Sequence, residues 1–267
     1  MISFVKAHAC GNDFLILEET VAAGKHAALT RKLCARNTSI GADGIEFIER
    51  RANGEFFLRL FNADGSEAEL SGNGTRCVAA WLAQSEGLNE VALGTHGGVR
   101  TCKLIGRKGE EFLIESGMGV PRVMPRTIVL DGVGEVPGAM VKVGNPHFVL
   151  FVDTPDFSAH GLSWQALGEK ISVSPLFPHG TNVEFVHVKS ASEIEFRIFE
   201  RGCGPTTSSG TGTCASSAAS IALRDANPEL TALAEGGAQS VVWPARGEAM
   251  RLTGPAEIIC TGEVLGL

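Results

Sequence analysis

Ser71-Gly72-Asn73-Gly74-Thr75-Arg76-Cys77 and Ser209-Gly210-Thr211-Gly212-Thr213-Cys214 are two copies of one pattern. In each copy a serine precedes Gly-x-Gly-Thr, and a run of small and apolar residues suited to a helix follows. A serine directly before a helix acts as an N-cap, and the glycines let a ligand approach the first backbone N–H groups. The sequence therefore predicts two helix starts that bind an anion.

The two copies lie 138 positions apart, since 209 minus 71 is 138, in a chain of 267 residues. A repeat at this distance indicates two related halves with a ligand shared between them. Strand-like runs dominate both halves, so we expect an α+β protein with two pseudo-symmetric domains, each a sheet wrapped around a central helix. The expected active site is the cleft between the domains.

The stretch Ser116-Gly117-Met118-Gly119-Val120-Pro121 is the best linker candidate, because glycine and proline break regular structure. We therefore expect an N-terminal half over residues 1–117 and a C-terminal half over 118–254, with strands in 255–267 returning to the first half. Elsewhere the patterns predict a helix over 27–35 and strands over 2–6, 14–17, 45–49, 56–61, 140–144, 148–152, 183–188 and 194–199.

Composition excludes several classes of partner. The net charge is −7 and the Lys and Arg residues are scattered, which suits neither nucleic acid nor an anionic membrane. No run approaches the ~18 apolar residues of a membrane span, and the first residues lack a signal-peptide pattern, so we expect a cytoplasmic protein. A small molecule is the expected partner, and a homodimer stays open as an alternative to a monomer.

The seven cysteines form no Cys-x-x-Cys pair and leave an odd count. This pattern fits reduced thiols better than a disulfide framework or a zinc site, so no metal is expected. Cys77 and Cys214 follow the two motif serines at a distance of roughly 7 to 9 Å along each helix, and we expect both to pack in the core.

Polar residues in loops and at strand ends complete a candidate binding site. An Arg suits a carboxylate and a Glu suits an ammonium group, so these residues favour a zwitterionic amino acid as ligand. The candidates are Asn12, Asn62, Asn145, Asn182, Glu200 and Arg201. His147, in Gly144-Asn145-Pro146-His147, is a further candidate and has no metal-ligand partner at helical spacing.

The same residues resemble the motifs of diaminopimelate epimerases. The matching stretches are residues 8–14, 41–44, 61–67, 72–77, 144–147, 181–182, 200–202 and 210–212. They follow in order along nearly the whole chain, so the resemblance is specific.

The resemblance implies an isomerase of lysine and cell-wall precursor synthesis that interconverts LL- and meso-diaminopimelate without a cofactor. Two cysteines at the helix starts face opposite sides of the α-carbon in the family, and their positions here are Ser71 and Ser209. The resemblance also implies that the helix starts at Gly72, Asn73, Gly210 and Thr211 hold the α-carboxylate, that the six polar candidates hold the remote end, and that His147 and Glu200 assist proton transfer.

Serine at both base positions departs from the family pattern. A hydroxyl is a far weaker acid than a thiol with its pKa near 8.5, and each pKa unit of mismatch costs ~1.4 kcal/mol, so we expect slow or blocked turnover. The serines are either replacements that trap a bound state, natural residues of a slow or altered epimerase, or signs of a homologue that only binds.

Two other functions stay open. One is an isomerase of another amino acid or of the phenazine-biosynthesis type, which uses an acidic residue, here Glu67 or Glu200. The other is a non-catalytic amino-acid-binding homologue.

Overall fold

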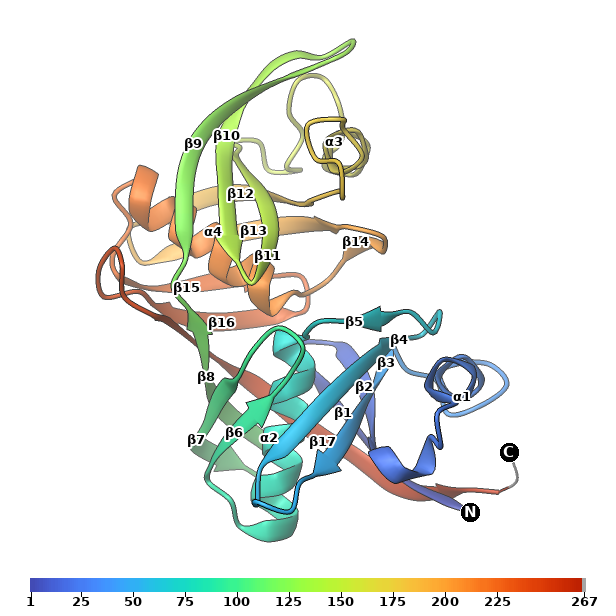
Figure 1. The fold of residues 1–267 in the computed structure, drawn as a ribbon. Coiled ribbons are helices and arrows are strands. Elements are labelled where there is room, and N and C mark those ends of the chain that lie inside the picture. The colour runs from blue at the N-terminus through green and yellow to red at the C-terminus, as the bar shows by residue number, and fades with distance from the viewer. Residues whose placement is uncertain (266–267) are drawn as a thin grey trace. The chain divides into compact units, whose positions relative to one another are not determined.

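The computed structural model describes residues 1–265. The chain divides into two compact units, one formed by Met1–Gly117 with the C-terminal segment from Thr253, and the other by Met118–Leu252. Strands outnumber helices in both units (Figure 1). The predicted α+β class is confirmed.

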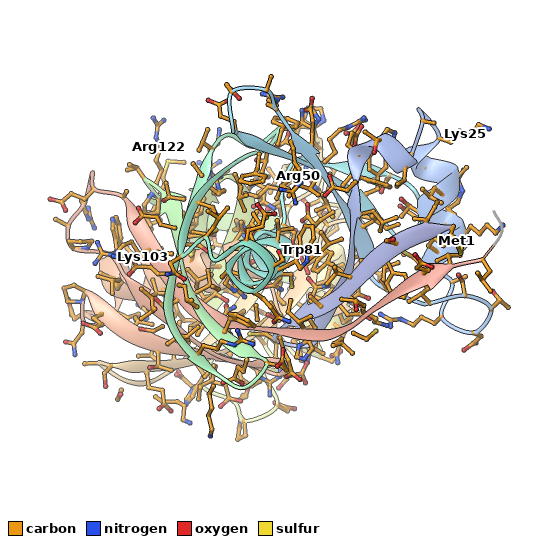
Figure 2. The ribbon with its side chains drawn as sticks, turned by 90° about the horizontal axis from the view of Figure 1, so that it is seen from below. Met1, Lys25, Arg50, Trp81, Lys103 and Arg122 are labelled. Atoms are coloured by element: carbon orange, nitrogen blue, oxygen red, sulfur yellow. The ribbon has the colours of Figure 1, made fainter. Side chains whose placement is uncertain are left out.

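In the first unit, strands surround helix α2. The elements are β1 (Ile2–Ala9), β2 (Asn12–Glu18), the 3-10 helix η1 (Glu19–Val21), α1 (His26–Leu33), β3 (Gly44–Arg50), β4 (Phe56–Asn62), β5 (Glu67–Ala68), α2 (Gly72–Glu86), β6 (Glu90–Gly94), β7 (Arg100–Lys108) and β8 (Glu111–Gly119). The final strand, β17 (Met250–Val264), pairs antiparallel with β1 over residues 2–8. Figure 2 views this unit along α2, near Trp81, with strands around the helix.

Two apolar clusters lie on opposite faces of β3. Ile45 and Phe47 pack in the cluster that contains Leu33 of α1, whereas Ile48 packs in the cluster that contains Val78 of α2. Side chains alternate between the two faces of a strand, so even-numbered residues of β3 face α2. Glu46 therefore faces the central helix.

In the second unit, strands surround helix α4. The elements are β9 (Arg122–Leu130), β10 (Gly134–Val143), β11 (Asn145–Phe151), α3 (Trp164–Ser172), β12 (Asn182–Ser190), β13 (Glu193–Glu200), β14 (Gly204–Thr206), α4 (Gly210–Leu223), β15 (Glu229–Ala234) and β16 (Gly237–Val242). Val183 and Phe185 of β12 pack with Leu167 of α3, and Val186 packs with Ala215 of α4. Glu184 therefore faces α4, as Glu46 faces α2.

The core of each unit depends on small residues in its central helix. Ala79 and Ala80 of α2 and Ala218 and Ala219 of α4 are at most 4% exposed. Short side chains let a helix approach the strands closely on several faces, and burying them removes apolar surface from water. The small-residue runs after the two motifs thus explain how one helix fits inside a curved sheet.

Three local features of the structure were not predicted from the sequence. Residues 116–119 lie in strand β8 and not in an irregular linker, and Pro146 lies inside β11, opposite Lys142, where it does not end the ladder. Helix α3 was not expected, although Ser163 caps it and Leu167 and Ile171 lie on its buried side. Pro146 is tolerated in β11 because the ladder loses only the one N–H group that proline lacks.

Candidate functional site

Ser71 caps helix α2. Its backbone is extended, with φ −121° and ψ 124°, and its Oγ accepts a hydrogen bond from Gly74 N at 3.0 Å. The predicted N-cap is confirmed, and it satisfies one of the N–H groups that have no partner inside the helix. The positive end of the helix dipole also lies here, so this helix start favours a negatively charged group.

Ser209 caps helix α4 in the same way. Its backbone has φ −145° and ψ 126°, and its Oγ accepts from Gly212 N at 3.3 Å. The Oγ also lies 3.4 Å from Thr211 Oγ1, and only 6% of Ser209 is exposed. In each unit the motif serine therefore caps the central helix.

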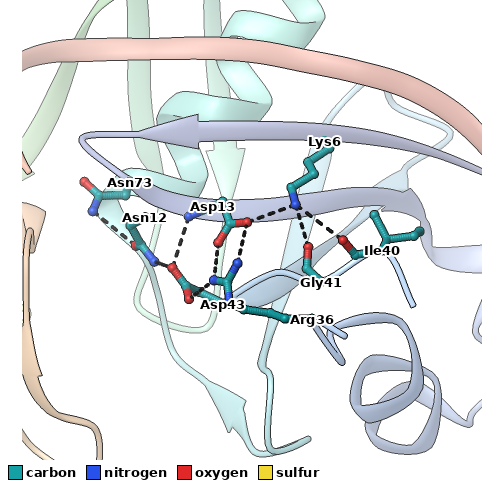
Figure 3. A network of polar contacts seen from close by, with 8 residues as sticks. All are labelled: Lys6, Asn12, Asp13, Arg36, Ile40, Gly41, Asp43 and Asn73. Atoms are coloured by element: carbon teal, nitrogen blue, oxygen red, sulfur yellow. Dashed lines mark hydrogen bonds and ion pairs between the residues drawn. The ribbon is translucent and has the colours of Figure 1, made fainter. Parts of the chain in front are cut away.

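Asn12 and Asn73 meet beside the first helix start. Asn73 Nδ2 donates to Asn12 Oδ1 at 3.2 Å, and Asn12 Nδ2 donates to Asp43 Oδ2 at 2.7 Å. Asn73 Oδ1 accepts from Nη2 of the fully buried Arg76 at 2.6 Å. The structure thus brings two predicted substrate-binding residues together and fixes their amide groups (Figure 3).

A charged network braces the turn that carries Asn12. Arg36 Nη2 lies 2.6 Å from both Asp13 Oδ1 and Asp43 Oδ1, and Lys6 Nζ lies 3.2 Å from Asp13 Oδ2. Burial alone would raise the pKa of Asp13, but hydrogen bonds from Arg36 and Lys6 hold it below its ordinary value. The network shown in Figure 3 therefore keeps this carboxylate ionised.

Asn62 closes the turn before α2. Its Nδ2 donates to Ser66 Oγ at 3.0 Å, and its backbone N–H donates to Ser66 O at 2.9 Å. Glu67, the acidic candidate of the alternative isomerase, binds Arg59 Nε at 2.7 Å and lies 3.3 Å from His96 Nε2. The hydrogen bond from Arg59 lowers the pKa of Glu67, which makes it a weak base.

His147 belongs to a buried polar chain in the second unit. Its Nδ1 lies 2.6 Å from Glu184 Oε1 and its Nε2 lies 2.8 Å from Asn145 Oδ1. The side chains of His147 and Glu184 are fully buried. Both ring nitrogens of His147 therefore face oxygen atoms, one of Glu184 and one of Asn145.

Glu200 lies next to the second helix start. Thr206 Oγ1 donates to its Oε1 at 2.5 Å. Burial raises the pKa of Glu200, and hydrogen bonds with Thr206 and Ser209 oppose that effect. The structure thus brings together two predicted catalytic residues, Glu200 and Ser209.

Asn182 and Arg201 are also neighbours. Asn182 Oδ1 accepts from the backbone N–H of Arg201 at 2.9 Å, and Asn182 is 3% exposed. The Arg201 side chain is exposed and donates from Nη1 to His179 O at 3.1 Å. Asn182 therefore fixes the backbone of Arg201, the residue that carries the exposed guanidinium.

The predicted carboxylate-binding residues lie in the first turns of the two helices. Gly72, Asn73 and Gly210 are buried, and Thr211 is half-buried. A Cβ at Gly212 would lie 2.5 Å from Ile198 Cδ1 and 3.1 Å from Glu184 Oε1. Any larger residue at position 212 would force the side chain of Ile198 to shift, since the strand side chains lie against the helix.

Glu46 and Glu184 were missed in the sequence, although a signal was present. Each is a charged residue inside an apolar strand run, in Ile45-Glu46-Phe47 and Val183-Glu184-Phe185. They lie 138 positions apart, since 184 minus 46 is 138, which is the spacing of the two serines. The repeat therefore places one buried glutamate behind each helix start.

The thiols near the motifs are core residues. Cys77 and Cys214 are fully buried in the apolar clusters around α2 and α4. Burial raises the pKa of Cys77 well above its ordinary value. A buried, protonated thiol cannot replace the base that the family places at residue 71.

Two features of the described residues bear on other classes of function. Across residues 1–265, no three His, Cys, Asp or Glu side chains gather as a metal site would require. Within the same range, no helix combines the length and the apolar composition that crossing a bilayer needs.

Comparisons with known proteins agree with this geometry. A family model for diaminopimelate epimerase matches residues 4–124 and 139–259. A diaminopimelate epimerase of Nostoc sp. is 36% identical over 287 residues, covering 98% of this chain and 99% of the relative. One from Pelotomaculum thermopropionicum is 34% identical over 278 residues, covering 97% and 98%.

Solved structures share the fold at low sequence identity. A probable proline racemase from Agrobacterium radiobacter has a TM-score of 0.76 and 17% identity, covering 99% of this chain and 93% of its own. A predicted epimerase from Pseudomonas aeruginosa also has a TM-score of 0.76, with 15% identity and full coverage of both chains. These likenesses concern the fold alone.

Proposed function

Because the chain belongs to the diaminopimelate epimerase family, we propose that it interconverts LL- and meso-diaminopimelate by proton transfer at the α-carbon. The reaction needs no cofactor: one group removes the α-proton and another group returns a proton to the opposite side. Each unit supplies one of these groups. Inversion of the stereocentre requires that both act on the same carbon atom.

The two helix starts bind the α-carboxylate in this proposal. Removing the α-proton leaves negative charge that spreads into the carboxylate, so N–H donors and a helix dipole stabilise the transition state more than the bound substrate. The donors are the backbone groups of Gly72, Asn73, Gly210 and Thr211. The serine caps support this role, because each orients the first turn of its helix.

The remote end of the substrate carries a second ammonium and a second carboxylate. The exposed guanidinium of Arg201 suits the carboxylate, and Glu200 suits the ammonium. Asn12, Asn62, Asn145 and Asn182 supply amide groups, several of which are oriented by internal hydrogen bonds.

The serines limit the rate. A serine hydroxyl is a far weaker acid than a thiol with a pKa near ~8.5, and each pKa unit of difference costs ~1.4 kcal/mol. Ser71 and Ser209 thus keep the capping function of the motif and lose the base strength that the family's cysteines provide. We expect slow turnover from the chain as it stands.

One observation carries the proposal: the two Ser-Gly-x-Gly helix starts, at a spacing of 138 residues, have the same capping geometry. The experiment measures solvent deuterium entering the α-position of diaminopimelate in D₂O. We expect slow incorporation by the wild type and at least hundredfold faster incorporation by the Ser71→Cys, Ser209→Cys double variant, within the range of a positioned acid or base.

A control distinguishes placement from the mere addition of thiols. Ser85→Cys with Ser192→Cys adds two cysteines at exposed positions, one of them in α2, and should leave the rate at the wild-type level. The proposal is wrong if restoring both motif thiols gives no gain over this control while diaminopimelate still binds, which would identify an amino-acid-binding homologue.

A further inference from the structure

Glu46 is a buried acid in an apolar setting. It is 1% exposed, and its neighbours across the sheet are Ile16 on β2 and Leu60 on β4, both in the core cluster of α2. Its Oε1 has no hydrogen-bond partner among the described residues. Burying an unpaired carboxyl group costs stability, so a residue of this kind needs an explanation other than folding.

The carboxyl group of Glu46 is aimed at the first helix start. A Cβ at Gly74 would overlap Glu46 Oε1, so the backbone of Gly74 lies directly against this oxygen. The N–H of the same glycine donates to Ser71 Oγ at 3.0 Å. The acid therefore lies beside the backbone that positions Ser71, and the second glycine of the motif makes room for it.

Glu184 occupies the same place in the second unit, but it has a partner. In the parallel β11–β12 pair, His147 lies opposite Asn182, which is two residues before Glu184. His147 Nδ1 lies 2.6 Å from Glu184 Oε1. In the first unit, Phe14 lies opposite Gly44, two residues before Glu46. A phenylalanine thus takes the position of the histidine, and Glu46 has no proton partner there.

The base strength of Glu46 is similar to that of the cysteine thiol that the motif lacks. Burial raises the pKa of Glu46 to about 8. An ordinary cysteine thiol has a pKa near ~8.5, so the two groups have a similar affinity for a proton. A general base acts best when its pKa lies near the working pH, and an ordinary glutamate near ~4.3 is too weak.

We propose that Glu46 is the catalytic base of the first unit and takes the α-proton of the bound amino acid in place of the missing thiol. The inference rests on the proposed function. The α C–H bond breaks, an O–H bond forms on Glu46, and the electron pair moves into the α-carbon and its carboxylate. The group on the opposite side of the carbon, which the proposed function requires, returns a proton there, and the reverse reaction exchanges these roles.

The experiment compares Glu46→Gln with Glu49→Gln in two backgrounds, the wild-type serines and the Ser71→Cys, Ser209→Cys variant. Glutamine keeps the shape of Glu46 and removes its basicity. Glu49 lies on the same strand with an exposed side chain that binds Arg51. The measured quantity is the rate of deuterium incorporation into diaminopimelate in D₂O.

With the wild-type serines, we expect Glu46→Gln to lower the rate by at least about a hundredfold and Glu49→Gln to leave it within about twofold. With both cysteines, we expect Glu46→Gln to keep a rate within about tenfold of its parent, since the thiols then move the proton. Activity in that background also shows that the variant folds.

Three results would overturn the role of Glu46. They are equal rates for the wild type and Glu46→Gln, loss of exchange from Glu46→Gln in both backgrounds, and absence of exchange in the wild type while the cysteine variant exchanges. In the last case the proposed function stands without Glu46. Absence of exchange in both backgrounds would instead refute the proposed function.

Discussion

At the scale of single residues, each motif serine has a structural task that does not depend on chemistry. Ser71 Oγ and Ser209 Oγ accept hydrogen bonds from the first turn of their helices. An N-cap hydroxyl typically contributes ~1 kcal/mol to stability. The serines therefore preserve the shape of the helix starts whatever they do to the rate.

We expect Ser71→Ala to lower the free energy of unfolding by about 1 kcal/mol, because Gly74 N loses its acceptor. Ser85→Ala is the matched control, since Ser85 lies in the last turn of the same helix and is exposed. Urea denaturation measures both. Equal stability of Ser71→Ala and the wild type would show that the cap is not needed.

The ionisation of Glu46 should appear in the pH dependence of stability. Its pKa is about 8 in the folded chain and near 4.5 when unfolded, so the unfolded state loses the proton first as pH rises. Relative to Glu46→Gln, the wild type keeps its full stability below about pH 4.5 and loses ~1.4 kcal/mol for each pH unit up to about 8.

Thermal or urea denaturation of both proteins between pH 4.5 and 8.5 tests this expectation. Cys77, whose charge would couple to Glu46, stays protonated in this range because burial raises its pKa. Parallel stability curves for the two proteins would mean that Glu46 titrates normally.

Residue-level signals were only partly visible in the sequence. The N-cap serines could be predicted, because a hydroxyl residue before a small-residue run acts locally. Glu46 and Glu184 left a weaker signal, a charge inside an apolar strand run. A glutamate in a strand usually points to water, and only the packing of α2 and α4 against β3 and β12 buries these two.

At the scale of elements, the first helix start is shaped by the strand beneath it. In the interior of a free helix, Gly→Ala raises stability by up to ~1 kcal/mol. At Gly74 the new Cβ would overlap Glu46 Oε1. We therefore expect Gly74→Ala to lower stability, which is the opposite sign.

Gly106→Ala is the control for this substitution, because a Cβ at Gly106 meets no atom within 4 Å. Thermal denaturation compares the two variants with the wild type. A gain in stability from Gly74→Ala would show that the carboxyl group of Glu46 does not press against this turn.

The loop that ends at Asp43 braces the turn carrying Asn12. Arg36 binds both Asp13 and Asp43, and Asp43 accepts from Asn12 Nδ2. We expect Arg36→Gln to raise KM for diaminopimelate roughly tenfold and to change kcat much less, because charge-assisted hydrogen bonds hold a binding amide in place. Steady-state kinetics in the cysteine double variant measures both constants.

Arg31→Gln serves as the control, since Arg31 is an exposed residue of α1 that donates to Asp64 O. Unchanged KM in Arg36→Gln would mean that Asn12 does not bind the substrate. An equal effect from the control would point to a general effect of lost charge.

Strand and helix patterns predicted most elements near the motifs. The expected helix over 27–35 is α1, and the expected strands over 45–49 and 194–199 are β3 and β13. The register of β11 against β12 could not be read from the sequence, because it depends on pairing between distant segments. That register is what brings His147 to Glu184.

At the scale of the whole molecule, the repeat of one motif explains why the fold class could be predicted from the sequence. Each unit encloses one capped helix in a sheet (Figure 1), and both the motif serines and the buried glutamates are 138 positions apart. The two units differ at their buried glutamates: Glu46 Oε1 has no hydrogen-bond partner among the described residues, and Glu184 Oε1 lies 2.6 Å from His147 Nδ1.

This divergence makes the account testable in one measurement on the wild-type chain. LL-diaminopimelate is incubated in D₂O to low conversion, and the deuterium content of the meso product is compared with that of the recovered substrate. Because separate groups remove and return the proton, we predict deuterium in nearly all of the product and little in the recovered substrate. Equal deuterium in both would mean that a single group exchanges the proton, and it would contradict the assignment of one proton-transfer group to each unit.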